Sequence, residues 1–281
     1  MENNNKIKVG LINFTNCLPL NYTLERHKPE NTQLIYGTPA ELNKLMAEEK
    51  VDVAPVSSFE YLKNKNKYTL MNTACISSDG ECGSVLVFSK TEPGRLNNSK
   101  IAVPCDSASS VAMLKIILNE HDIILRDVYF KEHNYSLSPE QYINSGFDAV
   151  LFIGDNALKY SYYTDKLFIY DIGKIWKHLT GYPAVFGTWA ARTAWVNKNQ
   201  DDFENIKKLI PNAIETGLGI YFNEILNISS YNLNMNKEII RDYLTKKIKY
   251  NFTVEHEKSL ELFKKLYDLL AKNEELHSIK T

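Results

Sequence analysis

Short apolar runs alternate along the chain with amphipathic stretches. The apolar runs have the length and the nearly continuous hydrophobicity of buried strands. They cover residues 7–14, 51–56, 100–103, 149–153, 167–172 and 184–191. Between them, apolar residues recur at the three- and four-residue spacing of helices that pack one face against a sheet. This alternation predicts the α/β class of fold.

Three predicted helices begin at capping boxes. Thr38, Ser57 and Ser138 are each followed three residues later by Glu or Gln, an arrangement in which the two side chains satisfy free N–H groups of the first turn. Asp106 and Ser107 predict the start of another helix. Beyond residue 201 the chain is predicted to be helical, and it ends in a long amphipathic stretch at 256–272.

Two changes in composition suggest borders between lobes. One is the polar stretch 91–99, and the other is Arg192 at the end of the last predicted strand. We therefore predict one lobe from residues 1–90 plus 192–281 and an inserted second lobe from residues 91–191. Because clefts between lobes are natural sites for small molecules, a two-lobe α/β fold with a ligand cleft between the lobes is expected.

The net charge and the amino-terminal sequence limit the kinds of binding partner that are expected. The 281 residues carry a formal net charge of -1, so no general positive field is expected to attract nucleic acid or an anionic membrane surface. An anionic ligand must then be held by local donors. The amino-terminal stretch has no signal-peptide pattern, which predicts a cytoplasmic protein if this is the native start. The oligomeric state is left open.

Metal and cofactor motifs are not apparent in the sequence. The four cysteines form no CxxC pair and the six histidines fall singly, whereas zinc sites need closer spacing. No phosphate-binding glycine loop or nucleophile elbow is present. Asp79 and Glu81 lie in a predicted turn and are interpreted as solvated charges. The sequence therefore predicts neither a metal nor a cofactor.

Small polar residues follow several predicted strands, at the start of the next helix. In open α/β sheets, ligands bind at the carboxyl ends of strands, where helix N-termini offer free N–H groups. For any single end, simple N-capping is the favoured explanation, but three such ends in one chain favour a shared site for an anion. The candidate substrate-binding residues are Ser57, Ser58, Ser107, Ser109, Ser110, Gly154 and Asp155.

Four blocks of sequence, in order, resemble the chorismate dehydratase family of the futalosine route to menaquinone. The blocks cover residues 9–20, 75–90, 153–158 and 170–192, and include an Asn-x-x-Pro-Leu and a Gly-x-x-x-Ser motif. The resemblance implies a periplasmic-binding-protein-like type II fold. It also implies a hydro-lyase that converts chorismate to 3-[(1-carboxyvinyl)oxy]benzoate and water.

The same resemblance assigns roles to individual residues. Asn16 and Ser84 match the polar residues at which the family carries out its reaction, and the serines at 107, 109 and 110 match a helix start that holds a substrate carboxylate. The sequence departs from the family at some positions that affect the shape and affinity of the site. Ala108 stands where Arg is common and Ser109 where Thr is common, and larger apolar residues are frequent at Ala184, Gly187 and Thr188.

The implied reaction suits these residue types. Loss of water makes the ring of chorismate aromatic, so the enzyme needs mainly to orient two carboxylates and stabilise developing charge. Asn and Ser donate hydrogen bonds but are poor bases near neutral pH. Our hypothesis is that the substrate's own side-chain carboxylate takes the proton. A non-catalytic binding protein or sensor for a small carboxylate is the alternative.

Overall fold

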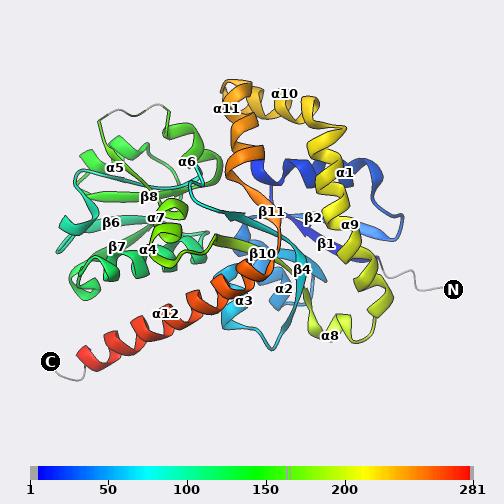
Figure 1. The fold of residues 1–281 in the computed structure, drawn as a ribbon, viewed down its shortest axis with the longest axis horizontal. Coiled ribbons are helices and arrows are strands. Elements are labelled where there is room, and N and C mark those ends of the chain that lie inside the picture. Colours follow the sequence, from blue (N-terminus) through cyan, green and yellow to red (C-terminus); the bar gives the residue numbers. More distant parts are fainter. Residues whose placement is uncertain (1–5, 163, 165, 279–281) are drawn as a thin grey trace. The chain divides into compact units, whose positions relative to one another are not determined.

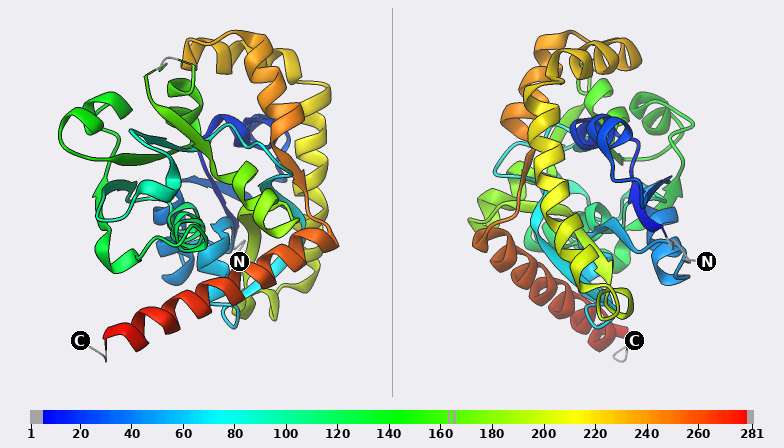
Figure 2. Two further views of the ribbon diagram at one scale, coloured as in Figure 1. Left: turned by 60° about the vertical axis from the view of Figure 1, so that its left-hand side comes forward. Right: turned by 90° about the vertical axis from the view of Figure 1, so that its right-hand side faces the viewer.

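The computed structural model describes residues 6–162, 164 and 166–278, and divides the chain into two compact units. Unit 1 comprises Met1–Ser77 and Val185–Val254, and unit 2 comprises Ser78–Ala184 and Glu255–Thr281. Each unit contains one sheet with helices, so the predicted α/β class is confirmed (Figures 1 and 2).

Unit 1 is built on a six-stranded sheet of order β11-β4-β10-β3-β1-β2. Its strands are β1 (Ile7–Leu11), β2 (Thr32–Tyr36), β3 (Val53–Ser57), β4 (Tyr68–Ser78), β10 (Ala184–Arg192) and β11 (Lys249–Asn251). Its helical segments are η1 (Thr15–Cys17), α1 (Leu18–His27), α2 (Pro39–Ala47), α3 (Ser58–Lys63), α8 (Thr193–Val196), α9 (Gln200–Gly219), α10 (Phe222–Leu233), α11 (Lys237–Asp242) and the π turn η4 (Tyr243–Lys247). The middle strand β3 is buried throughout, as its unbroken apolar run predicts.

Unit 2 is built on a five-stranded sheet of order β7-β6-β8-β5-β9. Its strands are β5 (Val85–Ser89), β6 (Lys100–Pro104), β7 (Tyr129–His133), β8 (Ala149–Ile153) and β9 (Phe168–Asp171). Its helical segments are η2 (Pro93–Arg95), α4 (Ala108–Glu120), η3 (Leu125–Asp127), α5 (Pro139–Asn144), α6 (Gly154–Tyr160), α7 (Ile172–Thr180) and α12 (Val254–Ser278). Phe88 and Phe152 lie at the centre of a buried cluster on this sheet.

The division between the units differs from the predicted lobes at three places. Residues 185–191, predicted for the second lobe, belong to unit 1, because β10 pairs with β3 in the first sheet. Residues 78–90 belong to unit 2, because β5 pairs with β8 and β9 in the second sheet. The last helix also belongs to unit 2: Trp176 of α7 packs edge-on against Phe263 of α12, at 5.5 Å between ring centroids, and donates its indole N–H to Ser259. Composition marks where polar segments lie, whereas strand pairing and side-chain packing decide which sheet a segment joins.

The predicted helix starts are confirmed in most details. Thr38 and Ser138 form complete capping boxes with Glu41 and Gln141. The prediction for α4 was wrong in one respect, because the side chain of Ser107 at the N-cap makes no capping bond. Its hydroxyl instead donates to the hydroxyl of Ser110, at 2.8 Å.

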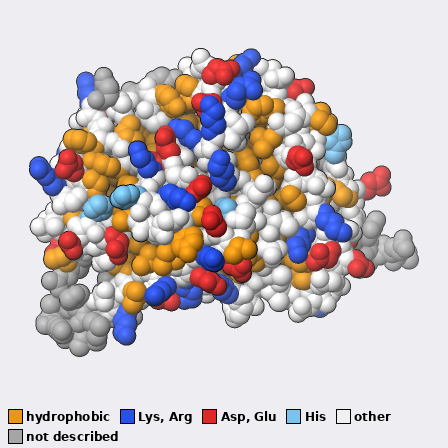
Figure 3. Space-filling model, in the orientation of Figure 1, with side chains coloured by type: hydrophobic (Ala, Val, Ile, Leu, Met, Phe, Trp, Pro, Cys, Tyr) orange, Lys and Arg blue, Asp and Glu red, His pale blue; other side chains and the backbone are white. Residues whose placement is uncertain are grey.

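One face of the molecule shows how charged side chains are distributed. On the face seen in Figure 3, lysine and arginine side chains are interspersed with aspartate and glutamate, in keeping with the net charge of -1. Among the residues that the structure describes, no helix is both long and apolar enough to span a bilayer.

Candidate functional site

The carboxyl edge of the unit 1 sheet carries the first group of predicted site residues. Strands β1 and β3 run parallel, with Val9 opposite Val53, so their carboxyl ends lie on the same edge of the sheet. The chain continues from β1 into η1, which contains Asn16, and from β3 into α3, whose N-terminus carries Ser57 and Ser58. The fold thus places these three residues along one edge of unit 1.

Asn16 is held in a buried position by its neighbours. Its side chain is 7% exposed, and its Oδ1 atom accepts a hydrogen bond from the thiol of Cys17, at 3.3 Å. Because the oxygen faces the thiol, the NH2 group is the part of this amide available to an anionic oxygen.

The backbone around Asn16 is supported by close packing of two helices. α1 follows η1 directly and lies alongside α9 (Figure 2). A Cβ atom at Gly217 of α9 would lie 2.6 Å from the carbonyl carbon of Pro19, so only glycine allows α9 to approach α1 this closely.

Ser57 and Ser58 take part in bonds that hold unit 1 together. Ser57 caps α3 by accepting the Glu60 N–H at 3.1 Å. Ser58 is fully buried and donates to the carbonyl of Val185 in β10, at 2.6 Å. Ser57 therefore acts as a helix cap, and Ser58 anchors the helix start to a neighbouring strand. Both contacts fit the N-capping explanation of these strand ends.

The carboxyl edge of the unit 2 sheet carries the second group. β6 and β8 are parallel, and β5 runs antiparallel to β8, with Val85 opposite Ile153. The start of β5 therefore lies beside the end of β8, and the Gly154 N–H donates to the Ser84 carbonyl at 2.7 Å. The end of β6, which leads to Ser107, lies on the same edge.

Ser84, Ser107, Ser109 and Ser110 are all small, buried hydroxyls at this edge. Their exposed fractions lie between 2% and 8%. α4, which begins at these serines, has 13 residues, enough for a well-developed positive end, whereas α3 and α6 have 6 and 7 residues. Asp155 is half-buried in the first turn of α6.

Ser84 follows a loop that is fastened to α7. Its hydroxyl lies 3.3 Å from the Cys82 thiol. The carboxylate of Asp171, which caps α7, accepts the N–H groups of Cys82 and Gly83 at 2.6 to 3.1 Å and that of Lys174 at 3.0 Å. Burial raises the pKa of Asp171, while these N–H donors favour its charged form.

Two further contacts fix the same loop, defined here as residues 78–83. Lys177 of α7 pairs with Asp79 at 2.5 Å. A Cβ atom at Gly173 would lie 2.7 Å from the carbonyl oxygen of Gly80.

Asp171 and Gly173 were missed as site residues from the sequence, although both lie within the fourth family block. The position of Asp171 between a predicted strand and a predicted helix was a signal that could have identified it as a helix N-cap.

A buried histidine lies at the end of β7, opposite Pro104 at the end of β6. His133 at the end of β7 contacts the carbonyl of Leu151 through Nε2 at 2.9 Å and accepts the Tyr135 N–H through Nδ1 at 3.1 Å. This pattern defines a neutral imidazole with the proton on Nε2. Burial lowers the pKa of His133, consistent with that form. The Tyr135 hydroxyl donates to Asp106 at 2.9 Å.

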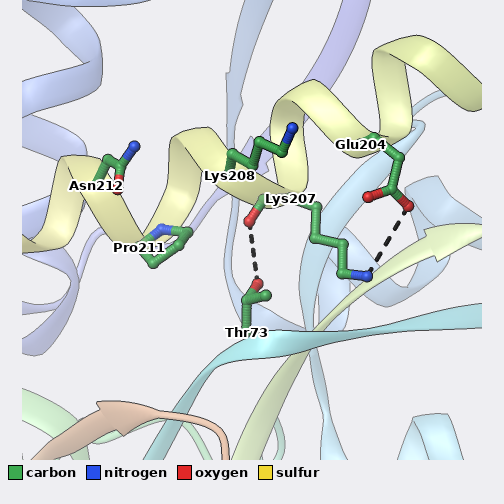
Figure 4. A pocket seen from close by; sticks show the side chains of 6 residues that line it. All are labelled: Thr73, Glu204, Lys207, Lys208, Pro211 and Asn212. Atoms are coloured by element: carbon green, nitrogen blue, oxygen red, sulfur yellow. Dashed lines mark hydrogen bonds and ion pairs between the residues drawn. The ribbon is translucent and has the colours of Figure 1, made fainter.

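A surface depression of about 380 Å³ lies elsewhere, between β4 and α9 of unit 1 (Figure 4). Pro211 inside α9 has no N–H to give to the Lys207 carbonyl. Thr73 of β4 supplies that bond instead, at 3.2 Å. No predicted site residue lines this depression, and its contacts are those that accommodate a proline in a helix.

Metal ligands do not gather in the described residues. Within 6–162, 164 and 166–278, no group of three or more His, Cys, Asp or Glu side chains is placed to hold an ion. All four cysteines are free thiols, and Cys105 is the exposed one.

Comparison with solved structures defines the class of protein. The chain has a periplasmic-binding-protein-like fold. A protein of Archaeoglobus fulgidus matches it with a TM-score of 0.76 at 18% identity, over 98% of this chain and 100% of that one. The periplasmic aliphatic sulphonate binding protein of Escherichia coli matches with a TM-score of 0.70 at 10% identity, over 96% and 88%.

Sequence comparison is more specific. The model of a family described as menaquinone biosynthesis matches residues 7–268, so the chain belongs to that family. A chorismate dehydratase of Thermus thermophilus is 29% identical over 200 residues, which are 66% of this chain and 69% of that protein. The resemblance inferred from the sequence blocks is thereby confirmed.

Proposed function

We propose that the protein is a chorismate dehydratase, a hydro-lyase that converts chorismate to 3-[(1-carboxyvinyl)oxy]benzoate and water. Family membership and the Thermus thermophilus relative support a role with this substrate in menaquinone biosynthesis. The observation that carries the proposal is the set of buried serine hydroxyls at the carboxyl edge of unit 2, next to the N-terminus of α4. Uncharged donors of this kind suit an anionic substrate in a protein without net positive charge.

The α4 end is proposed to anchor one substrate carboxylate. Ser109 and Ser110 lie in the first turn, where backbone N–H groups and the positive end of the helix favour an anion. The hydrogen bond from Ser107 to Ser110 fixes the two hydroxyls relative to one another. Asp155 cannot bind a carboxylate directly, and its proposed role is to accept a hydrogen bond from the ring hydroxyl.

Asn16 and Ser84 are proposed to act on the reacting atoms. The Asn16 NH2 group and the Ser84 hydroxyl donate to oxygens on which negative charge grows as the ring proton leaves. Both donors are buried and held in place before the substrate binds. The Cys17 thiol orients the Asn16 amide, and the Asp171 contacts hold the loop before Ser84.

The proton acceptor is proposed to be the substrate itself. In the elimination, the C–H bond beside the ether oxygen breaks, its electron pair forms the new ring double bond, and the neighbouring hydroxyl leaves. The side-chain carboxylate takes this proton and then passes it to the departing hydroxide, which leaves as water, so that the carboxylate returns to its charged form. Asn and Ser are unsuited to removing that proton at neutral pH.

The decisive experiment uses the purified full chain and chorismate, without added metal or cofactor. Mass spectrometry is expected to detect a product lighter by one water, and its ultraviolet spectrum should be that of an aromatic ring. Calorimetric titration with chorismate is run in parallel. Binding without loss of water would replace the proposal with a carboxylate-binding protein or sensor, and neither binding nor turnover would overturn both.

A further inference from the structure

Tyr250 of β11 has a buried hydroxyl that finds no hydrogen-bond partner among the described residues. The side chain is 8% exposed, whereas the neighbouring Lys249 and Asn251 are exposed. β11 pairs with β4, with Lys249 opposite Ser77 and Asn251 opposite Ala74, and the register shifts between these two pairs. Since side chains alternate along a strand, Tyr250 must point inward.

The surroundings of this hydroxyl connect it to the candidate site. Tyr250 lies near enough to Cys17 for the two groups to interact electrostatically. The Cys17 thiol in turn donates to the Oδ1 atom of Asn16. The phenol therefore lies in the neighbourhood of the thiol that orients the proposed reacting amide, and all three residues belong to unit 1.

A buried hydroxyl without a partner destabilises the folded protein, because its hydrogen bonds to water are lost and not replaced. Each such group in a native protein calls for an explanation, and a functional role is one of the recognised ones. Burial raises the pKa of Tyr250 well above its ordinary value, so the group remains protonated at neutral pH and is able to donate.

We propose that Tyr250 is a further ligand-binding residue of the Asn16 site, and that its O–H donates to an oxygen atom of the bound carboxylate compound. The inference rests on the proposed function and adds to it a residue outside the predicted set. It also explains why a short strand late in the chain places a phenol, rather than an apolar ring, in this buried position.

The test compares Tyr250→Phe with Tyr68→Phe, a matched control in the same unit. Tyr68 is 4% exposed, and its hydroxyl donates to Glu60 at 3.1 Å. Removing a bonded hydroxyl lowers the unfolding temperature, whereas removing an unbonded one leaves it unchanged or raises it. We expect Y250F to match or exceed the parent Tm while kcat/KM for chorismate falls at least about tenfold, and Y68F to lose Tm at the parent kcat/KM.

The other outcomes separate a failure of this proposal from a failure of the proposed function. If Y250F loses as much Tm as Y68F, its hydroxyl is a structural bond and the proposal is overturned. An active parent with an equally active Y250F also overturns it. A parent that leaves chorismate unchanged overturns the proposed function instead. Calorimetry with chorismate then decides on Tyr250: weaker binding by Y250F supports the proposal, and equal or absent binding overturns it.

Discussion

Individual side chains of the candidate site differ in what surrounds their polar atoms, and this difference predicts what each contributes. The Ser58 hydroxyl donates a hydrogen bond to the Val185 carbonyl and stabilises unit 1. Ser84 is just as buried, but it follows a loop held by Asp171 and lies at the sheet edge beside Gly154. A buried hydroxyl is thus a structural bond in one case and a proposed reactive donor in the other.

Ser84 and Ser109 should be separable by kinetics. A donor to charge that develops during proton removal is worth ~2.7–4 kcal/mol, so Ser84→Ala should lower kcat by ~10²–10³-fold. Ser109→Ala should mainly raise KM, because a carboxylate anchor acts equally on the bound substrate and the transition state. Steady-state kinetics with chorismate measures both effects.

Ser145 provides a control in the same unit, since it lies outside the candidate site and its hydroxyl donates to the Tyr142 carbonyl. Ser145→Ala should retain the parent kcat and KM. If Ser84→Ala turns over at the parent rate, its proposed role is wrong. If that variant unfolds, Ser84 is a structural hydrogen bond.

His133 should make stability depend on pH. Its pKa in the folded protein is lowered from the ordinary 6.5, mainly by burial, with the Leu151 carbonyl and Asp106 opposing that shift. The unfolded chain therefore binds more protons below about pH 6.5, and stability should fall as the pH drops from about 6.5 towards 5. His256, also in unit 2, has a lowered pKa and acts in the same direction.

Thermal unfolding of the parent and of His133→Gln across this range measures the contribution. The glutamine variant keeps a donor and an acceptor but does not titrate, so its Tm should fall less steeply with decreasing pH. Parallel curves for the two proteins would show that His133 is not the titrating group.

At the scale of elements, α7 serves as the support for the loop of residues 78–83. The carboxylate of Asp171, its N-cap, accepts hydrogen bonds from the loop backbone, and Lys177 pairs with Asp79. Gly173 allows the loop to approach α7 closely. The loop leads directly to Ser84, so the position of this hydroxyl depends on a helix that lies about 90 residues later in the chain.

Gly173→Ala should displace the loop. A Cβ atom there meets the Gly80 carbonyl at 2.7 Å and Cys82 Cβ at 3.0 Å, contacts that backbone can relieve only by moving. Overpacking of this kind typically costs 1–3 kcal/mol, so we expect roughly that loss of stability together with a lower kcat. Gly94→Ala is the control, because nothing lies within 4 Å of its added carbon. Parent kcat in Gly173→Ala would show that loop position does not matter.

At the scale of the whole molecule, the chain passes between the two units more often than an inserted lobe requires. After completing unit 1, it enters unit 2 again through α12, where Phe263 is 1% exposed. The final helix is therefore part of the core of unit 2, although it follows unit 1 in sequence.

Phe263→Ala should destabilise unit 2 selectively. Truncating a buried phenylalanine to alanine costs about 3–5 kcal/mol. Hydrogen exchange followed by mass spectrometry should show faster exchange in α7, against which Phe263 packs through Trp176. Exchange in α9 of unit 1 should stay at the parent rate. Faster exchange in α9 with an unchanged α7 would contradict this assignment of the last helix.

The sequence by itself determined the local features of this protein. Continuous apolar runs identified buried strands such as β3 and β8, and the Thr38 and Ser138 boxes identified helix starts. These features depend on residues close together in the chain, where periodicity and capping act directly. Four short blocks of sequence were also enough to identify the family.

Tertiary structure alone decided features that depend on distant residues. Strand pairing put Ser84 in unit 2 and not in the lobe predicted for it, and packing against Trp176 put α12 there as well. The Tyr250 hydroxyl finds no partner among the described residues, and Asp171 holds the Ser84 loop, only because segments far apart in sequence meet in the fold. Hydrogen bonding and burial are properties of neighbours in space, and residue spacing along a chain does not specify them.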